Sequence, residues 1–199
     1  MSLTIPNLLS LLRMGLVPFF IIAVIDGQPR RALLLFVVAG VTDALDGAIA
    51  RIWKQQSLLG AYLDPIADKL LLTSAYVALA FPSLNPGTQI PVWVTVLVIA
   101  RDVLILVMAL VLFLALGIKS FPPTVISKVT TVAQVAAVAV VLVSGLVEDL
   151  EPFALGLVYV VAGLTVISGL DYIVRTNRMV GERARHEGAA ASSPTDSAS

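Results

Sequence analysis

Four aspartates, Asp43, Asp46, Asp64 and Asp68, lie close together in a sequence whose other long stretches are almost entirely apolar. On an α-helix, with about 3.6 residues per turn, Asp43 and Asp46 share one face, and so do Asp64 and Asp68. Ionised side chains at membrane depth are costly and usually face a partner or a polar cavity. The spacing therefore predicts two carboxylate walls that need positive charge between them.

Divalent metal ions would supply that charge. The chain has no cysteine, and its one histidine, His186, lies near the C-terminus, so carboxylates must carry any chemistry. Hard oxygen ligands favour Mg²⁺ or Mn²⁺ over zinc, and a pair of such ions is the recurring device for displacement at phosphorus. Helix capping is the alternative. It fits Asp64, which precedes Pro65, but not Asp43 and Asp46, which lie inside an apolar run.

The composition defines the elements that must position these carboxylates. The chain has 199 residues, of which 58% are hydrophobic and 13% charged. A bilayer core of about 30 Å needs roughly 20 apolar residues per helix. We expect an all-α membrane protein with six transmembrane helices, centred on residues 8–25, 32–50, 62–81, 91–117, 122–147 and 152–174. Residues 1–174 form one membrane domain, and residues 175–199 form a basic and then disordered tail.

The basic residues of the loops predict the orientation. Arg51 and Lys54, Lys119 and Lys128, and the arginines after residue 174 all fall on one side, whereas the loop between the fifth and sixth segments is acidic. Arg30 and Arg31 are the exception. The balance favours a multi-pass protein of a bacterial-type inner membrane with both termini in the cytoplasm. The polar active-site cavity between the helices would open to that side.

Small residues accompany the acids. Gly47 and Ala50 share a helical stretch with Asp43 and Asp46, so they would let another helix or a flat ligand approach the backbone closely. The spacing leaves both uses open.

The full pattern is Asp43-x2-Asp46-Gly47-x2-Ala50-Arg51-x8-Gly60-x3-Asp64-x3-Asp68. It resembles the signature of the CDP-alcohol phosphatidyltransferase family, with every specified position filled. The resemblance implies a six-helix fold covering the chain to about residue 174, and it implies a reaction. In that reaction an alcohol displaces the CDP group of a lipid, CMP leaves and a phosphodiester forms.

The resemblance also implies roles for single residues. Asp43, Asp46 and Asp64 correspond to the ligands of one metal ion, and Asp43, Asp64 and Asp68 to those of the second. Asp68 corresponds to the general base as well. The nucleotide pocket corresponds to Gly47, Ala50, Arg51 and Gly60, in which small residues admit cytidine and the arginine offers a planar fork to phosphate oxygen. The donor would be CDP-diacylglycerol, and a homodimer is expected.

Arg101 and Lys128 are candidates for binding the acceptor alcohol. Both fall at the predicted depth of the aspartates, where an anionic acceptor needs cations, although either could snorkel or pair with Asp102. Arg13, in the first apolar segment, is equally open to a direct role or to snorkelling at the interface.

The motifs around these cations favour one acceptor. Phosphatidylglycerophosphate synthases, which use glycerol 3-phosphate, usually show Arg-Glu and Gly-Lys-x-Lys-Thr. This chain has Arg101-Asp102 and Ser127-Lys128-x-x-Thr131, with Thr130 in place of the second lysine, which resembles the CMP-forming cardiolipin synthases. One lysine fewer suits phosphatidylglycerol, a monoanionic diester, better than a near-dianionic monoester. Glycerol 3-phosphate is the alternative acceptor.

A transporter or channel is the alternative outside enzymology, with the aspartates binding a translocated cation. The chain shows no inverted repeat of broken segments, and transport gives no reason for the glycine, alanine and arginine positions of the signature. Nothing in the sequence predicts a nucleic-acid partner.

Overall fold

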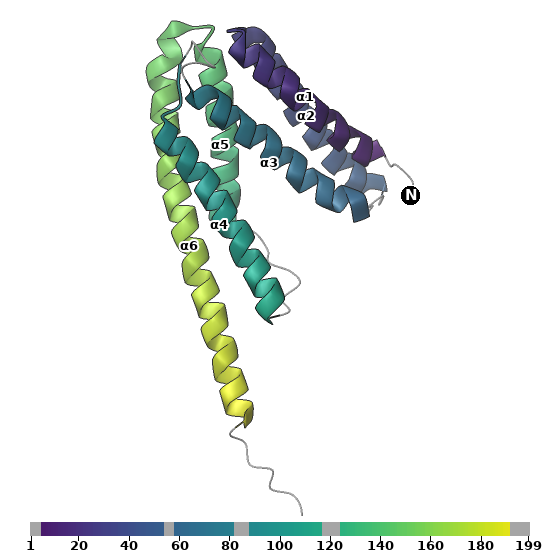
Figure 1. Cartoon of the computed structure of the whole chain (residues 1–199), viewed down its shortest axis with the longest axis vertical. Helices are drawn as coiled ribbons and strands as arrows, with labels where there is room; N and C mark the ends of the chain where they lie inside the picture. Colours follow the sequence, from purple (N-terminus) through teal and green to yellow (C-terminus); the bar gives the residue numbers. More distant parts are fainter. Residues whose placement is uncertain (1–4, 54–57, 82–87, 117–123, 192–199) are drawn as a thin grey trace, which may run out of the picture.

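The computed structural model describes the backbone of residues 5–53, 58–81, 88–116 and 124–191. Within these ranges it describes all side chains except those of 5–7, 44–53, 58–66, 68, 113, 115–116, 148 and 178–191. The described chain is all-α, as predicted (Figure 1). Its elements are α1 (Ile5–Ile25), α2 (Pro29–Trp53), α3 (Leu58–Ala80), α4 (Val92–Leu116), α5 (Val125–Ser144), a 3-10 turn η1 (Glu148–Leu150) and α6 (Glu151–Ala191).

Local sequence explains where several helices begin and end. Gly27 adopts φ 62°, and the amide of Gln28 donates to the Ala23 carbonyl at 2.9 Å, which closes α1 with a left-handed glycine turn. Pro29 then occupies the first position of α2, where its missing N–H costs nothing. Thr124 caps α5, because its hydroxyl accepts a hydrogen bond from the Ser127 amide at 3.0 Å.

The six helices form two groups. In the first, α1 packs against both α2 and α3, and in the second, α6 packs against both α4 and α5. The groups meet where the α1–α2 turn lies against the end of α5, and a Cβ on Gly145 would come within 3.1 Å of the Pro29 ring. From there the ribbons of α1–α3 and of α4–α6 diverge (Figure 1).

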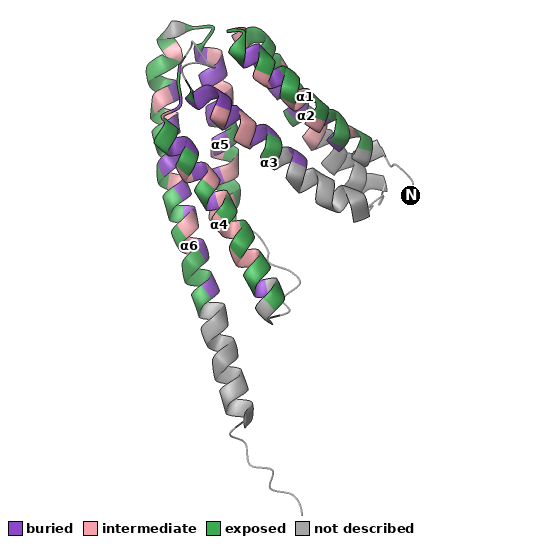
Figure 2. Cartoon of the chain, in the orientation of Figure 1, coloured by how far each residue is buried: buried purple, intermediate pink, exposed green. Residues whose placement is uncertain are grey.

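One apolar core joins the groups near the end at which they meet. Phe20 of α1, Leu79 of α3, Val94 of α4, Val138 of α5 and Val158 of α6 are all buried in it. Exposed residues, by contrast, cover the outward faces of the helices (Figure 2). Many of those are large and apolar, such as Leu34, Leu106 and Leu170, which is the arrangement expected of helices that face lipid.

Within the part of the chain that the structure describes, four helices are long and apolar enough to cross a membrane, in the segments Leu8–Ile25, Val92–Leu112, Val125–Ser144 and Glu151–Asn177. They indicate an integral, multi-pass membrane protein. Four of the six predicted spans thus coincide with helices of sufficient length and apolar character. Helices α2 and α3 carry the charged residues of the aspartate pattern, and in α3 the described apolar stretch shortens to Lys69–Ala80. Membrane crossing by α2 and α3 stays a prediction.

Helix α6 continues beyond residue 174, where the sequence analysis places the end of the membrane domain, and reaches Ala191. The extension is rich in Ala, Arg and Glu, which are strong helix formers. Residues 192–199 of the predicted tail lie outside the described part of the chain.

Candidate active site

The four aspartates lie on the two helices that the pattern predicts. Asp43 and Asp46 belong to α2, and Asp64 and Asp68 belong to α3. The helical backbone therefore confirms that the members of each pair share a face. Gly47, Ala50 and Arg51 follow on α2, and Gly60 precedes on α3. Of these residues, the structure describes the side chain of Asp43 alone.

Asp43 forms an ion pair that the sequence analysis does not foresee. Its Oδ1 lies 2.8 Å from an Nη1 of Arg13, whose side chain is 1% exposed, against 43% for Asp43. Arg13 is therefore enclosed by the helices instead of extending along the lipid-facing surface. The cations near the aspartates in sequence are therefore not the only ones that can balance their charge. Helix α1 supplies one from elsewhere.

This ion pair predicts a stability effect for Asp43 that is separate from any metal. Asp43→Asn should lower the free energy of unfolding by about 1–3 kcal/mol, because it replaces a charged hydrogen bond to a buried guanidinium by a neutral one. Thermal unfolding of the purified protein in a metal chelator measures this, since metal binding then contributes nothing. The matched control is Asp26→Asn, at an exposed aspartate of the α1–α2 turn. Equal melting temperatures for the two variants would contradict the prediction.

Arg101, on α4, is buried and makes hydrogen bonds to three residues. Its Nε and Nη2 donate to the Ser168 hydroxyl of α6 at 3.2 and 2.7 Å, Nη2 also donates to the Ser127 hydroxyl at 2.6 Å, and Nη1 donates to Asp102 Oδ1 at 2.8 Å. A guanidinium has five N–H donors, so these contacts use most of its capacity. A direct contact between Arg101 and an acceptor would use the remaining N–H or would replace one of the hydrogen bonds to a serine.

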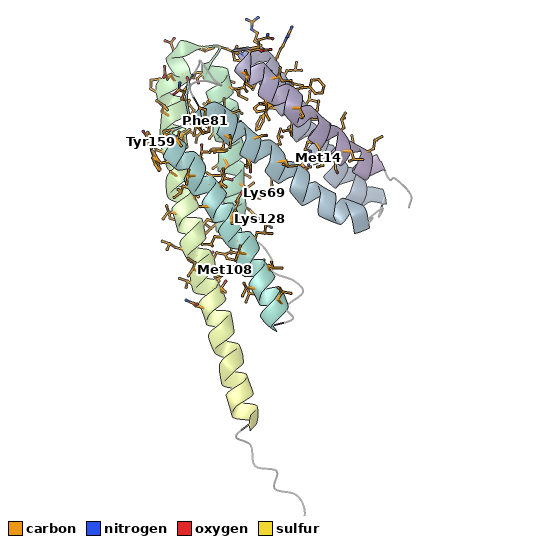
Figure 3. All side chains as sticks on the ribbon, in the orientation of Figure 1. Met14, Lys69, Phe81, Met108, Lys128 and Tyr159 are labelled. Atoms are coloured by element: carbon orange, nitrogen blue, oxygen red, sulfur yellow. The ribbon has the colours of Figure 1, made fainter. Side chains whose placement is uncertain are left out.

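The two acceptor candidates lie on different helices, α4 and α5, which a side-chain hydrogen bond joins: Ser127, which accepts from Arg101, immediately precedes Lys128. Lys128 is exposed, and its amide bonds to the Thr124 carbonyl at 3.1 Å in the first turns of α5 (Figure 3). Thr130 is buried on a different face and lies within 3.4 Å of the Leu164 carbonyl of α6. A lysine at position 130 would therefore point between α5 and α6 and not join Lys128.

Two further residues of this network, Ser168 and Lys69, are missing from the sequence-based site. Lys69 of α3 pairs with Asp102 Oδ2. Ser168 belongs to a set of buried polar residues on α6, which comprises Thr165, Ser168, Tyr172 and Thr176. Their spacing of three or four residues along an otherwise apolar helix is the sequence signal that could have found it.

The Ser168 contacts predict a second stability effect. Ser168→Ala removes the acceptor of two guanidinium hydrogen bonds in a buried place, so the free energy of unfolding should fall by about 1–3 kcal/mol. Thr165→Val is the matched control, because the Thr165 hydroxyl bonds to the Val161 carbonyl of its own helix at 2.7 Å. Denaturation of both variants in detergent measures the difference. A loss in Thr165→Val as large as in Ser168→Ala would show that the contact with Arg101 is unimportant.

Among the described residues, a cavity of about 220 Å³ lies at the end where the two helix groups meet. Its lining includes Val24, Gln28, Leu79, Thr88 and Gly145. This end is opposite to the one at which α2 ends and α3 begins with the aspartates (Figure 1). The cavity is therefore not the predicted active-site cavity.

The fold and the site define an all-α, multi-pass membrane protein with paired aspartates on α2 and α3 and a buried arginine on α4 that hydrogen-bonds to α5 and α6. Comparison with known proteins agrees. The sequence model of the CDP-alcohol phosphatidyltransferase family matches residues 3–171. The chain belongs to this family.

Relatives with three different names match the chain at 34–40% identity. It is 40% identical to the cardiolipin synthase (CMP-forming) of Homo sapiens over 154 residues, which cover 68% of this chain and 49% of that protein. It is 40% identical over 111 residues to the CDP-diacylglycerol–glycerol-3-phosphate 3-phosphatidyltransferase of Haemophilus influenzae, covering 53% of this chain and 57% of that protein. A probable phosphatidylglycerophosphate synthase of Mycobacterium tuberculosis is 34% identical over 186 residues, covering 88% of this chain and 82% of that protein. The chain thus spans about half the length of the first two relatives.

Proposed function

We propose that this protein transfers the phosphatidyl group of CDP-diacylglycerol to phosphatidylglycerol, forming cardiolipin and releasing CMP. The observation that carries the proposal is the complete aspartate signature on α2 and α3 within a family match over residues 3–171. A phosphatidyl transfer needs neutralised phosphates and a base for the acceptor hydroxyl, and carboxylates at these positions can provide both.

The donor set fits hard divalent cations. It consists of carboxylates on two helices. One Mg²⁺ or Mn²⁺ ion would be held by Asp43, Asp46 and Asp64, and a second by Asp43, Asp64 and Asp68. When bound, these ions would neutralise the pyrophosphate of the donor and stabilise CMP as it leaves. Arg13 supports this arrangement by fixing one oxygen of Asp43 at 2.8 Å.

The remaining residues of the signature bind the donor and move the proton. Gly47, Ala50 and Gly60 leave room for cytidine, and Arg51 contacts phosphate oxygen. Asp68 takes the proton of the acceptor hydroxyl while the acceptor oxygen attacks phosphorus.

Lys128 binds the phosphate of the acceptor, and Arg101 contributes positive charge beside it. Asp102 contacts both Arg101 and Lys69, so it offsets part of the local positive charge. A moderately positive site suits the single charge of phosphatidylglycerol. The name of the human relative, at 40% identity, agrees with this acceptor.

Glycerol 3-phosphate is the second candidate acceptor. It is favoured by the names of the Haemophilus and Mycobacterium relatives, the latter of which aligns with 88% of this chain.

The proposal includes the setting of the reaction. The protein is an inner-membrane homodimer with both termini in the cytoplasm, and the cavity that holds the aspartates opens to that side. The water-soluble CMP can then leave directly into the cytoplasm.

Offering the acceptors separately tests the assignment. Purified protein in detergent receives CDP-diacylglycerol with Mg²⁺ or Mn²⁺ and either phosphatidylglycerol or glycerol 3-phosphate, and the lipid products are separated. Cardiolipin as the main product supports the first proposal, and phosphatidylglycerophosphate supports the second. Failure of every acceptor to yield CMP would favour a transporter instead.

A further inference from the structure

The two helix groups carry different parts of the proposed site. Helices α2 and α3, of the first group, carry the aspartates, and α4 and α5, of the second, carry Arg101 and Lys128. Figure 1 shows the groups diverging toward the ends of α2 and α3 that bear the aspartates. The reaction needs the donor and acceptor parts at a fixed separation, so the contacts between the groups, among them those of α3 with α4, set its geometry.

Two described polar contacts join α3 to α4. Deep in the core, the Thr95 hydroxyl donates to the Tyr76 carbonyl at 3.2 Å. About two helical turns, or roughly 10 Å, nearer the diverging ends, the Lys69 ammonium pairs with Asp102 Oδ2. The Lys69–Asp102 pair is thus placed where the two groups begin to separate.

Further hydrogen bonds connect the Lys69–Asp102 pair to the other helices of the second group. The other oxygen of Asp102 accepts from Arg101, and Arg101 reaches Ser127 of α5 and Ser168 of α6. On the α3 side, Lys69 directly follows Asp68 in the chain. A continuous series of polar contacts therefore runs from the residue beside the proposed base to the residue beside the proposed acceptor lysine.

We propose that Lys69 is a positioning residue, whose ion pair with Asp102 holds the aspartate-bearing helix α3 at a working separation from the acceptor-binding helices α4 and α5. The inference rests on the proposed function for its consequence in catalysis. Its structural part, the tie between the two groups, stands independently. Misplacement of reacting groups by about 1 Å can cost on the order of a hundredfold in rate, so a tie of this kind acts on turnover.

Neutralisation of charge in the membrane is the competing role for this pair. That role requires no particular distance between α3 and α4, and it predicts that an uncharged residue at position 69 is harmless. Asp102 already pairs with Arg101 at 2.8 Å, so neutralising the Asp102 charge does not require Lys69. Lys69 is 48% exposed and Asp102 is 14% exposed, so the lysine already has access to surroundings other than Asp102.

The first test compares three variants by steady-state kinetics. Lys69→Met keeps the length of the side chain and removes the ionic contact, and we expect at least a tenfold loss of kcat, with the Michaelis constant for CDP-diacylglycerol within about threefold of wild type. Lys69→Arg keeps the contact and should restore most of the rate. Arg31→Met, which removes an exposed charge at the start of α2, is the control and should leave kcat unchanged. Wild-type kcat in Lys69→Met would overturn the proposal.

The second test measures the separation directly. The chain has no cysteine, so spin labels can be attached through Leu12→Cys and Leu110→Cys, two exposed positions on α1 and α4. These lie near Met14 and Met108, which Figure 3 places on the two diverging groups. We expect a longer or broader distance distribution in Lys69→Met than in wild type or Lys69→Arg. Identical distributions in all three proteins would overturn the tie.

The two readouts separate failure of this inference from failure of the proposed function. If wild-type protein released no CMP from CDP-diacylglycerol, the proposed function would fail, and the distance measurement would still decide whether Lys69 holds the groups together. If wild-type protein were active and Lys69→Met matched it in both rate and distance, the inference alone would be wrong.

Discussion

Asp46→Asn and Asp64→Asn should each abolish measurable CMP release from CDP-diacylglycerol while the protein still inserts into membranes. Each change removes a charged oxygen ligand from the proposed metal site and keeps the size of the side chain. Losses of transition-state charge stabilisation of this kind are on the order of a hundredfold to a thousandfold in rate. Release of CMP by purified variants, at saturating Mg²⁺ or Mn²⁺, measures the effect.

Two comparisons show whether the loss comes from metal binding. Direct titration of each variant with Mn²⁺ should show weaker binding than in wild type, and Asp26→Asn, at the exposed turn between α1 and α2, should retain both binding and rate. If Asp46→Asn or Asp64→Asn kept more than a few per cent of the wild-type rate, the two-metal site would be wrong.

Lys128→Ala should raise the Michaelis constant of the acceptor about tenfold to hundredfold, because a charge-assisted contact is worth on the order of 1.5–3 kcal/mol. Lys128 is exposed and lies near the N-terminus of α5, where the helix dipole already disfavours a cation. A bound anion at this place would interact favourably with both the Lys128 ammonium and the helix dipole. In the proposed mechanism the metal ions and Arg51 contact the phosphates of the donor, so the phosphate of the acceptor is the expected partner of Lys128.

Kinetics with each substrate varied in turn measure this effect. The Michaelis constant for CDP-diacylglycerol should change much less than that for the acceptor, and Lys128→Arg should retain most of the acceptor affinity. A parallel rise in both constants would mean that Lys128 does not discriminate between the two substrates. Thr130→Lys is not a suitable test of acceptor charge, because position 130 is buried against α6.

The fold was predictable from sequence because each helix is signalled locally. Apolar runs, a glycine in the left-handed region at Gly27 and the threonine cap at Thr124 all act over a few residues. The helical spacing of Asp43 with Asp46, and of Asp64 with Asp68, was predictable for the same reason. The two helices that carry these acids were predicted to cross the membrane like the others, and that crossing stays a prediction.

Contacts between distant segments were beyond local patterns. Arg13 pairs with Asp43, Lys69 with Asp102, and Arg101 with Ser168, and each pair joins two different helices. Charge alone did not identify these partners, since Asp102 could equally have paired with Lys128. Which side chains meet depends on how α3 and α4 cross and on which face of α6 is turned inward. Helix packing sets both, and a single sequence does not reveal it.

The most direct measurement is the stoichiometry of CMP and cardiolipin formed by the purified wild-type protein. CDP-diacylglycerol labelled in its phosphatidyl phosphate is mixed with phosphatidylglycerol and a divalent cation, and both products are quantified over time. We predict one CMP for each cardiolipin, with the label in the new phosphodiester and no product when the cation is chelated. CMP without labelled cardiolipin, or no CMP with any acceptor, would contradict the proposed phosphatidyl transfer.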